Sequence, residues 1–255
     1  MNSLAPPPVV SDIATKFAHV NAWIFDLDNT LYPTDCGLWP MIEKRITLFL
    51  IEHSGLDGAS ARALQRYYYH RHGTTLRGLV DEDAVIPADF LDFVHDIDRS
   101  GLAPNPPLAL EIARLPGRKL IFTNGSRDHA MRTIEQLGLD GLFEDAFDIV
   151  AAGLVPKPLD AAYDSFFLAH GVDPAHAAMF EDIAKNLIVP KARGMTTTLV
   201  VARPDQVDHR QAHDRVWAHT SDIDFVTDDL AAFLGEINDC LEAPPVSRLL
   251  GLDAV

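Results

Sequence analysis

The sequence has little cysteine, few basic residues relative to acidic ones, and no apolar run as long as a membrane-spanning helix needs. Its two cysteines, Cys36 and Cys240, lie far apart and in no recognisable motif, which argues against a disulfide framework. Lysine and arginine together number 21, against 37 aspartates and glutamates, and the formal charge is −16. A surface this negative repels nucleic acid polymers and anionic membranes, so we expect neither as a partner.

The N-terminal region lacks the basic stretch followed by an apolar run that a secretion signal has. Its prolines instead predict a loose tail over residues 1–19, and the patternless sequence at 241–255 predicts a second one. Sparse cysteine and the missing signal favour a cytoplasmic protein. Hydrophobic residues make up 47% of the chain, so we expect a large buried core between the two tails.

Short apolar runs alternate with helical patterns along the second half of the chain. The predicted strands are 22–27, 119–124, 146–152, 177–182, 196–201 and 223–228. The predicted helices among them are 127–138, 159–170, 184–193 and 230–237. Nearly continuous apolar strands that alternate with helices indicate an α/β fold with a doubly wound, Rossmann-like, mostly parallel sheet.

Residues 34–105 interrupt this alternation because they contain no strand pattern. Amphipathic periodicity predicts helices there instead, at 40–53, 59–72 and 87–99. We therefore expect an all-helical cap at 34–105, inserted into an α/β core that consists of residues 20–33 and 106–240.

Polar residues follow four of the predicted strands at the point where each strand ends. Ligands of open α/β sheets bind outside the carboxyl ends of the strands, so these residues are expected to form one site. They are Asp26 and Asp28, then Thr123, Asn124 and Gly125, then Lys157, and last Glu181, Asp182 and Asn186. Two aspartates by themselves also occur in turns and helix caps. Four polar groups in this order make a purely structural role for Asp26 and Asp28 a weak interpretation.

These groups carry a resemblance to a known family. The segments "DLDNT" (26–30), "FTNG" (122–125), "KP" (157–158) and "FEDIAKN" (180–186) resemble the motifs of haloacid dehalogenase (HAD) superfamily hydrolases. The helical block at 34–105 lies where that superfamily has a first-type cap. Within it, "YYYHRHGTTLRGL" (67–79) is similar to the pyrimidine 5′-nucleotidase-like branch.

The residue types suit phosphoryl transfer, which needs positioning and charge neutralisation. A carboxylate can attack phosphorus and form an aspartyl-phosphate, and Asp26 at the strand tip is the predicted nucleophile. Asp28 is the predicted general acid and base, and Lys157 a fixed positive charge. Thr123 offers a hydroxyl, and the backbone amides of Asn124 and Gly125 precede a helix N-terminus, where anions bind.

The resemblance also implies a Mg²⁺ ion, which would remove the repulsion between Asp26 and a phosphate. By that resemblance, Asp26, Asp182 and the backbone carbonyl of Asp28 are ligands. Glu181 ligates the metal directly or through water, and Asn186 holds a metal-bound water or orients a ligand.

Substrate choice is expected in the cap, at residues 66–79. This segment concentrates aromatic side chains, which stack on bases, and arginines, which pair with phosphate or carbonyl groups. Arg66, Tyr68 and Arg77 are the predicted substrate-binding residues, and a nucleoside monophosphate is the expected substrate.

Four other functions stay open. One is a phosphatase for a different small phosphorylated metabolite, and another is a phosphosugar mutase, which also uses both aspartates. A 2-haloacid dehalogenase has little use for Asp28 or Mg²⁺. A non-catalytic binding module would have no need of Asp26, Asp28, Lys157 and Asp182 together. The sequence does not indicate the oligomeric state.

Overall fold

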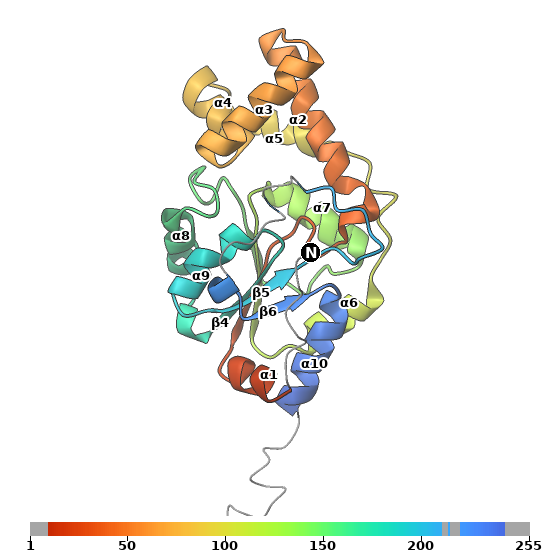
Figure 1. Cartoon of the computed structure of the whole chain (residues 1–255), viewed down its shortest axis with the longest axis vertical. Helices are drawn as coiled ribbons and strands as arrows, with labels where there is room; N and C mark the ends of the chain where they lie inside the picture. The colour runs from red at the N-terminus through yellow and green to blue at the C-terminus, as the bar shows by residue number, and fades with distance from the viewer. Residues whose placement is uncertain (1–9, 211–213, 215–219, 243–255) are drawn as a thin grey trace, which may run out of the picture.

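A parallel sheet forms the core of the protein, and a group of helices forms a cap above the ends of its strands (Figure 1). The computed structural model describes residues 10–210, 214 and 220–242. Within them the sheet has six parallel strands in the order β3-β2-β1-β4-β5-β6. The strands are β1 (Ala22–Phe25), β2 (Arg118–Phe122), β3 (Asp145–Phe147), β4 (Ala177–Glu181), β5 (Thr196–Val200) and β6 (Phe225–Thr227). The predicted α/β core is confirmed.

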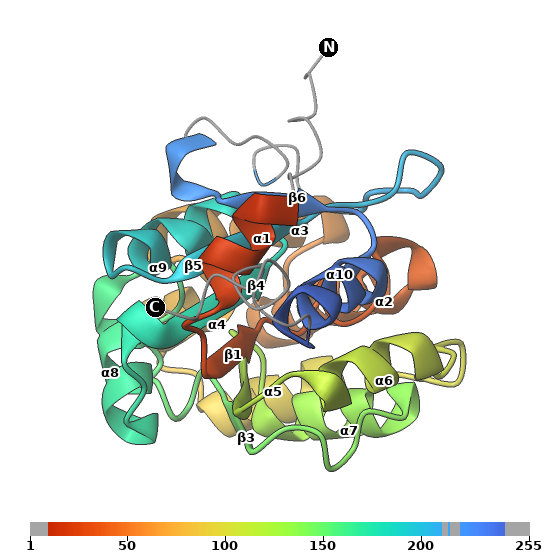
Figure 2. The same cartoon turned by 90° about the horizontal axis from the view of Figure 1, so that it is seen from below.

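Helices cover both faces of the sheet, because successive side chains of a strand point to opposite sides. In β1, Trp23 and Phe25 pack in one hydrophobic cluster, whereas Ala22 and Ile24 pack in the other. The first cluster includes side chains of α1 (Val10–Phe17), α6 (Pro106–Arg114), α7 (Arg127–Leu137) and α10 (Leu230–Glu242). The second includes side chains of α8 (Asp160–His170) and α9 (Ile188–Ala192), which lie on the opposite side in Figure 2. The carboxyl ends of the strands therefore remain open toward the cap.

The prediction of an N-terminal tail is wrong for residues 10–17, which form α1. Ile13 and Phe17 are buried in the core. The Phe17 ring stacks on Trp23 and Phe225, with centroids 5.8 and 5.3 Å away. Residues 13 and 17 lie one helical turn apart and so share one face, a signal that the neighbouring prolines obscured.

The cap consists of four helices among the described residues, with a hydrophobic cluster of their own. They are α2 (Leu38–Ser54), α3 (Gly58–His72), α4 (Thr75–Asp83) and α5 (Pro87–His95). The three predicted cap helices correspond to α2, α3 and α5, and α4 was not predicted. Ile149, from the core loop after β3, belongs to the cap cluster. At Gly73 a Cβ atom would lie 2.9 Å from Pro156, so cap and core also approach closely there.

Several boundaries differ from the prediction, among them the end of α5, which lies at His95 instead of residue 99. Strand β3 ends at Phe147 instead of residue 152, because the Asp148 carboxylate accepts hydrogen bonds from the backbone of Arg127 and Ala151 and turns the chain. The helix predicted at 184–193 is a 3₁₀ turn followed by α9. Helix α10 extends to Glu242, and the rest of both predicted tails lies outside the described residues. None of the described helices combines the length and apolarity needed to cross a membrane.

Asp224, just before β6, connects three parts of the core. Its Oδ1 accepts hydrogen bonds from Lys16 of α1 at 2.7 Å and Lys191 of α9 at 2.6 Å, and its Oδ2 accepts one from the backbone of Thr197 at 3.1 Å. Burial alone would raise the pKa of Asp224, but the hydrogen bonds from Lys16 and Lys191 outweigh it and lower the pKa. The charge of this carboxylate therefore stabilises the fold.

We predict that Asp224→Asn lowers the free energy of unfolding by about 2 kcal/mol near neutral pH. A lowered folded-state pKa stabilises the protein above the unfolded pKa, and this contribution is lost as the pH falls through the folded pKa. The difference between variant and native protein should therefore be constant above about pH 5 and shrink only as the pH falls below about 4. Urea unfolding at several pH values measures it, with the exposed Asp92→Asn as the control. A difference that stays constant with pH would contradict the role of the charge.

Candidate active site

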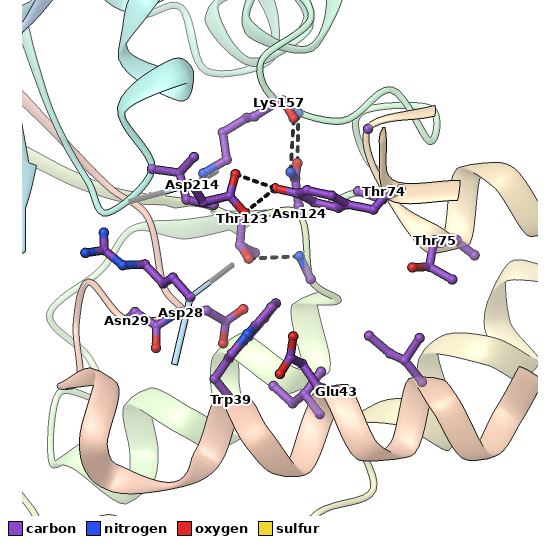
Figure 3. A pocket seen from close by; sticks show the side chains of 18 of the residues that line it. Asp28, Asn29, Trp39, Glu43, Thr74, Thr75, Thr123, Asn124, Lys157 and Asp214 are labelled. Carbon is purple, nitrogen blue, oxygen red and sulfur yellow. Dashed lines mark hydrogen bonds between the residues drawn. The ribbon is translucent and has the colours of Figure 1, made fainter. Parts of the chain in front are cut away.

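The predicted core residues converge in one pocket between core and cap. Asp26 and Asp28 follow β1, Thr123 follows β2, and Lys157 enters from the loop before α8 (Figure 3). All nine line the pocket: Asp26, Asp28, Thr123, Asn124, Gly125, Lys157, Glu181, Asp182 and Asn186. The prediction that these residues meet at the ends of the strands is confirmed, and their chemical roles stay predictions.

Lys157 is the centre of the buried charge network. Its ammonium donates hydrogen bonds to Asp26 Oδ1 at 2.7 Å, Glu181 Oε2 at 2.7 Å and the backbone carbonyl of Phe122 at 2.8 Å. Its side chain is buried, so water does not compete for these donors. Burial alone would lower the pKa of Lys157, but the charges of Asp26 and Glu181 outweigh it and raise the pKa above its ordinary value. Lys157 is therefore a fixed cation.

The acidic side chains around Lys157 fit a metal ion. Carboxylate oxygens of Asp26, Glu181 and Asp182 all lie within 4.8 Å of one another. Burial and the charge of Glu181 raise the pKa of Asp26 to about 8, against the lowering effect of Lys157. Asp182 Oδ2 and Asn186 Oδ1 are buried without a hydrogen-bond partner in the described part of the chain. Lys157 and Arg210, which lies 3.9 Å from Asp182 Oδ2, balance only part of the negative charge of this cluster. Its unbonded oxygen donors therefore suit a hard divalent cation.

Asp28 has different surroundings, outside this cluster. Its Oδ1 accepts hydrogen bonds from the Tyr32 hydroxyl and from His129 Nε2, the latter at 2.9 Å. Burial alone would raise the pKa of Asp28, but the nearby His129 and the hydrogen bonds from His129 and Tyr32 outweigh it and lower the pKa. The surroundings therefore raise the pKa of Asp26 and lower the pKa of Asp28.

The segment after β2 fixes the Lys157 loop. The Asn124 side chain accepts a hydrogen bond from the Lys157 backbone amide at 2.9 Å and donates one to the Lys157 carbonyl at 3.2 Å. The backbone amide of Gly125 donates to Thr123 Oγ1 at 2.9 Å. The prediction that the Gly125 amide is available to an anion is thus wrong for this conformation, because its proton is already used.

The cap closes the pocket with an apolar wall that carries a few polar groups. Trp39 and Glu43, from α2, project toward Asp28 and Thr123 (Figure 3). The apolar part consists of Ile42, Ile46, Leu76, Phe90, Leu91 and Val94. Predicted Arg66 also lines the pocket. A substrate bound to the core residues would therefore meet an aromatic ring and apolar side chains at its other end.

A family model for haloacid dehalogenase-like hydrolases matches residues 20–194, more than half of the chain. The protein belongs to this family. It is 28% identical over 134 residues to phosphate metabolism protein 8 of Saccharomyces cerevisiae. That match covers 48% of this chain and 41% of the yeast protein, so it spans less than half of either.

Solved structures of HAD hydrolases share the fold. An L-2-haloacid dehalogenase from Xanthobacter autotrophicus aligns with a TM-score of 0.54 at 19% identity, covering 86% of this chain and 99% of its own. A HAD family hydrolase from Deinococcus radiodurans R1, with bound phosphate and sodium, aligns at 0.51 and 20%, covering 89% and 100%. Hydrolases of this family generally use a divalent metal, which agrees with the buried acidic cluster.

Two of the predicted substrate-binding residues lie outside the pocket. Tyr68 is buried in the cap, where its hydroxyl donates to Asp83 and its ring packs so closely on α4 that a Cβ at Gly78 would lie 2.4 Å away. Arg77 pairs with Asp81 at 2.7 Å on the cap surface. Both were expected from composition alone, which does not tell which side of a helix faces the core. The neighbouring Tyr69 lines the pocket instead.

Several residues in and beside the pocket were missed. His129 does not line the pocket but hydrogen-bonds to Asp28, and it lies in the first turn of the helix after β2, so the strand ends could have indicated it. Trp39 lies one turn before Ile42 of the predicted helix 40–53, and both side chains line the pocket. Lys185 and Asp214 hydrogen-bond to the Tyr69 hydroxyl. Lys185 lies within the segment 180–186, directly before Asn186, so that segment could have indicated it, whereas no local pattern indicates Asp214.

We predict that Lys157→Met lowers the free energy of unfolding by about 3–5 kcal/mol, because it leaves Asp26 and Glu181 buried without their cation. Urea unfolding in the presence of a chelator measures the loss. Lys44→Met, which removes the charge of an exposed lysine, is the matched control and should change stability little. A Lys157→Met protein as stable as this control would contradict the buried network.

Proposed function

We propose that this HAD hydrolase is a Mg²⁺-dependent phosphomonoesterase that forms an aspartyl-phosphate on Asp26. The observation that carries the proposal is the contrast between its two aspartates. Asp26 lies in a buried acidic cluster beside Lys157, and Asp28 lies two residues away, held by His129 and Tyr32. Two carboxyl groups in opposite environments suit two different roles in one reaction.

The proposed reaction has two steps. Asp26 attacks phosphorus, and the bond from phosphorus to the leaving oxygen breaks. Asp28 takes the proton that a monoester monoanion carries and passes it to that oxygen, so the free alcohol departs. Water then attacks the phosphorus of the aspartyl-phosphate while Asp28 accepts a proton from it. Asp26 returns as a carboxylate, inorganic phosphate leaves, and Asp28 releases its proton.

The protein's own residues prepare these steps. Lys157 fixes the Asp26 carboxylate through Oδ1, and the Thr123 hydroxyl lies in the same pocket to bind a phosphoryl oxygen. Asp26, Asp182 and the Asp28 carbonyl would hold the Mg²⁺ ion, with Glu181 and Asn186 beside it. When bound, the ion supplies positive charge for the phosphoryl oxygens.

A 2-haloacid dehalogenase is less well supported, although solved dehalogenases share the fold. A halide ion leaves without a proton, so that reaction needs neither the hydrogen-bonded Asp28 nor an acidic cluster that could hold a metal ion. In this protein both features are present.

Within this function we propose a pyrimidine nucleoside monophosphate as substrate. Trp39 offers an aromatic face to a base, while Glu43, Gln65 and Thr75 offer hydrogen-bonding groups on the cap side of the pocket. The name of the yeast relative, phosphate metabolism protein 8, agrees with phosphate chemistry. A cytoplasmic location, where such metabolites occur, is part of the proposal. Assays of UMP and CMP beside AMP and sugar phosphates test the substrate, and isomerised sugar phosphate would indicate a mutase.

We predict that Asp26→Asn abolishes Mg²⁺-dependent phosphate release, because an amide cannot displace the leaving oxygen. Asp28→Asn should lower kcat about 10²–10⁴-fold, since it removes the acid and base. Phosphate release from UMP with Mg²⁺, and with chelator, measures both, and the exposed Asp92→Asn is the control. Undiminished turnover by Asp26→Asn would overturn the mechanism, and a blank screen for native protein would favour a binding module.

We predict that Trp39→Ala raises the KM for UMP about tenfold, because a stacked base is lost, and leaves the KM for ribose 5-phosphate nearly unchanged. Steady-state kinetics with both esters measure the difference. Tyr67→Ala removes a ring that is 47% exposed on the cap and does not line the pocket, so it is the matched control. An equal change for both esters would contradict base stacking on Trp39.

A further inference from the structure

The segment 96–105 links α5 of the cap to α6 of the core. A chain of hydrogen bonds runs from this linker to Asp28. Arg99 lies in the segment between α5 and α6, and its guanidinium is buried. One nitrogen of that group donates to the carbonyl of His95 at 3.2 Å and contacts His129 Nδ1 at 2.8 Å. His129 Nε2 in turn lies 2.9 Å from Asp28 Oδ1. Arg99 thus reaches Asp28 through a single imidazole ring.

The chemistry of the guanidinium fixes the direction of these bonds. A guanidinium has only donors, so His129 Nδ1 must accept. An imidazole that accepts at Nδ1 carries its proton on Nε2, and Nε2 therefore donates to Asp28. The ring is fully buried and stacks on His95 with centroids 4.4 Å apart and planes 8° apart, which holds its orientation.

The two donors to Asp28 bind the same oxygen. The Tyr32 hydroxyl and His129 Nε2 both reach Oδ1. In the described part of the chain no hydrogen bond to Oδ2 is found, and Asp28 lines the pocket. Oδ2 is therefore the oxygen that can carry a proton to and from a substrate, and the donors on Oδ1 set where it points.

We propose that His129 and Arg99 are positioning residues for proton transfer: Arg99 fixes the His129 tautomer, and His129 orients the Asp28 carboxyl so that Oδ2 faces the leaving oxygen. This inference rests on the proposed phosphatase function. A ring that only filled space in the core would need no fixed tautomer, and its loss would affect every substrate alike.

The kinetic test compares two leaving groups. An alkoxide needs a proton as it leaves, whereas 4-nitrophenolate does not. His129→Leu should therefore lower kcat/KM at least about tenfold more for an alkyl phosphate than for 4-nitrophenyl phosphate. His129→Gln keeps an N–H donor and should recover most of the loss. His176→Leu, which removes a surface histidine paired with Asp173 at 2.8 Å, should change neither value.

Equal losses for the two esters, or a glutamine variant no better than leucine, would overturn the proposal. A second measurement requires no turnover, so it separates failure of this proposal from failure of the phosphatase function. Nitrogen-15 NMR of histidine-labelled native protein should show, for the signals that His129→Gln removes, an unprotonated Nδ1 and a protonated Nε2. A proton on Nδ1 would overturn the proposal.

Discussion

The contact on which the site depends is the buried ammonium of Lys157 between Asp26 and Glu181. Placing several carboxylates in a core is costly unless each has a cation or a hydrogen-bond donor. Lys157 reaches them because Asn124 holds its loop through both backbone groups. Among the described residues, Asp182 and Asn186 still have buried oxygens that accept no hydrogen bond, and a divalent cation would bind there.

Because the buried charges lie in the core, the core and the cap contact different parts of a substrate. The core holds charge in fixed positions at the ends of buried strands, where it can serve any phosphoryl group. The cap adds an apolar wall with Trp39 and Arg66, and so it faces the rest of the substrate. Asp28 lies between the two, and its hydrogen bond to His129 connects it through Arg99 to the linker that joins them.

The core site could be predicted from sequence because each strand end is a local pattern and a parallel sheet brings all of them to one edge. Other features follow from packing between distant segments. Phe17 stacks on Trp23 and Phe225, and this packing stabilises a helix where the prolines predicted a loose tail. Tyr68 faces inward because Gly78 makes room for its ring, and Tyr69 faces the pocket. Composition places the aromatic residues in the cap but not on a given side of its helices.

Trapping the covalent intermediate tests directly whether Asp26 is the nucleophile. Protein turning over a phosphomonoester with Mg²⁺ is quenched in acid, digested, and analysed by mass spectrometry for a phosphorylated carboxylate. We expect one phosphoryl group on the peptide that contains Asp26, and specifically on that side chain. Turnover without a phosphorylated carboxylate, or with the phosphoryl group on another residue, would contradict it.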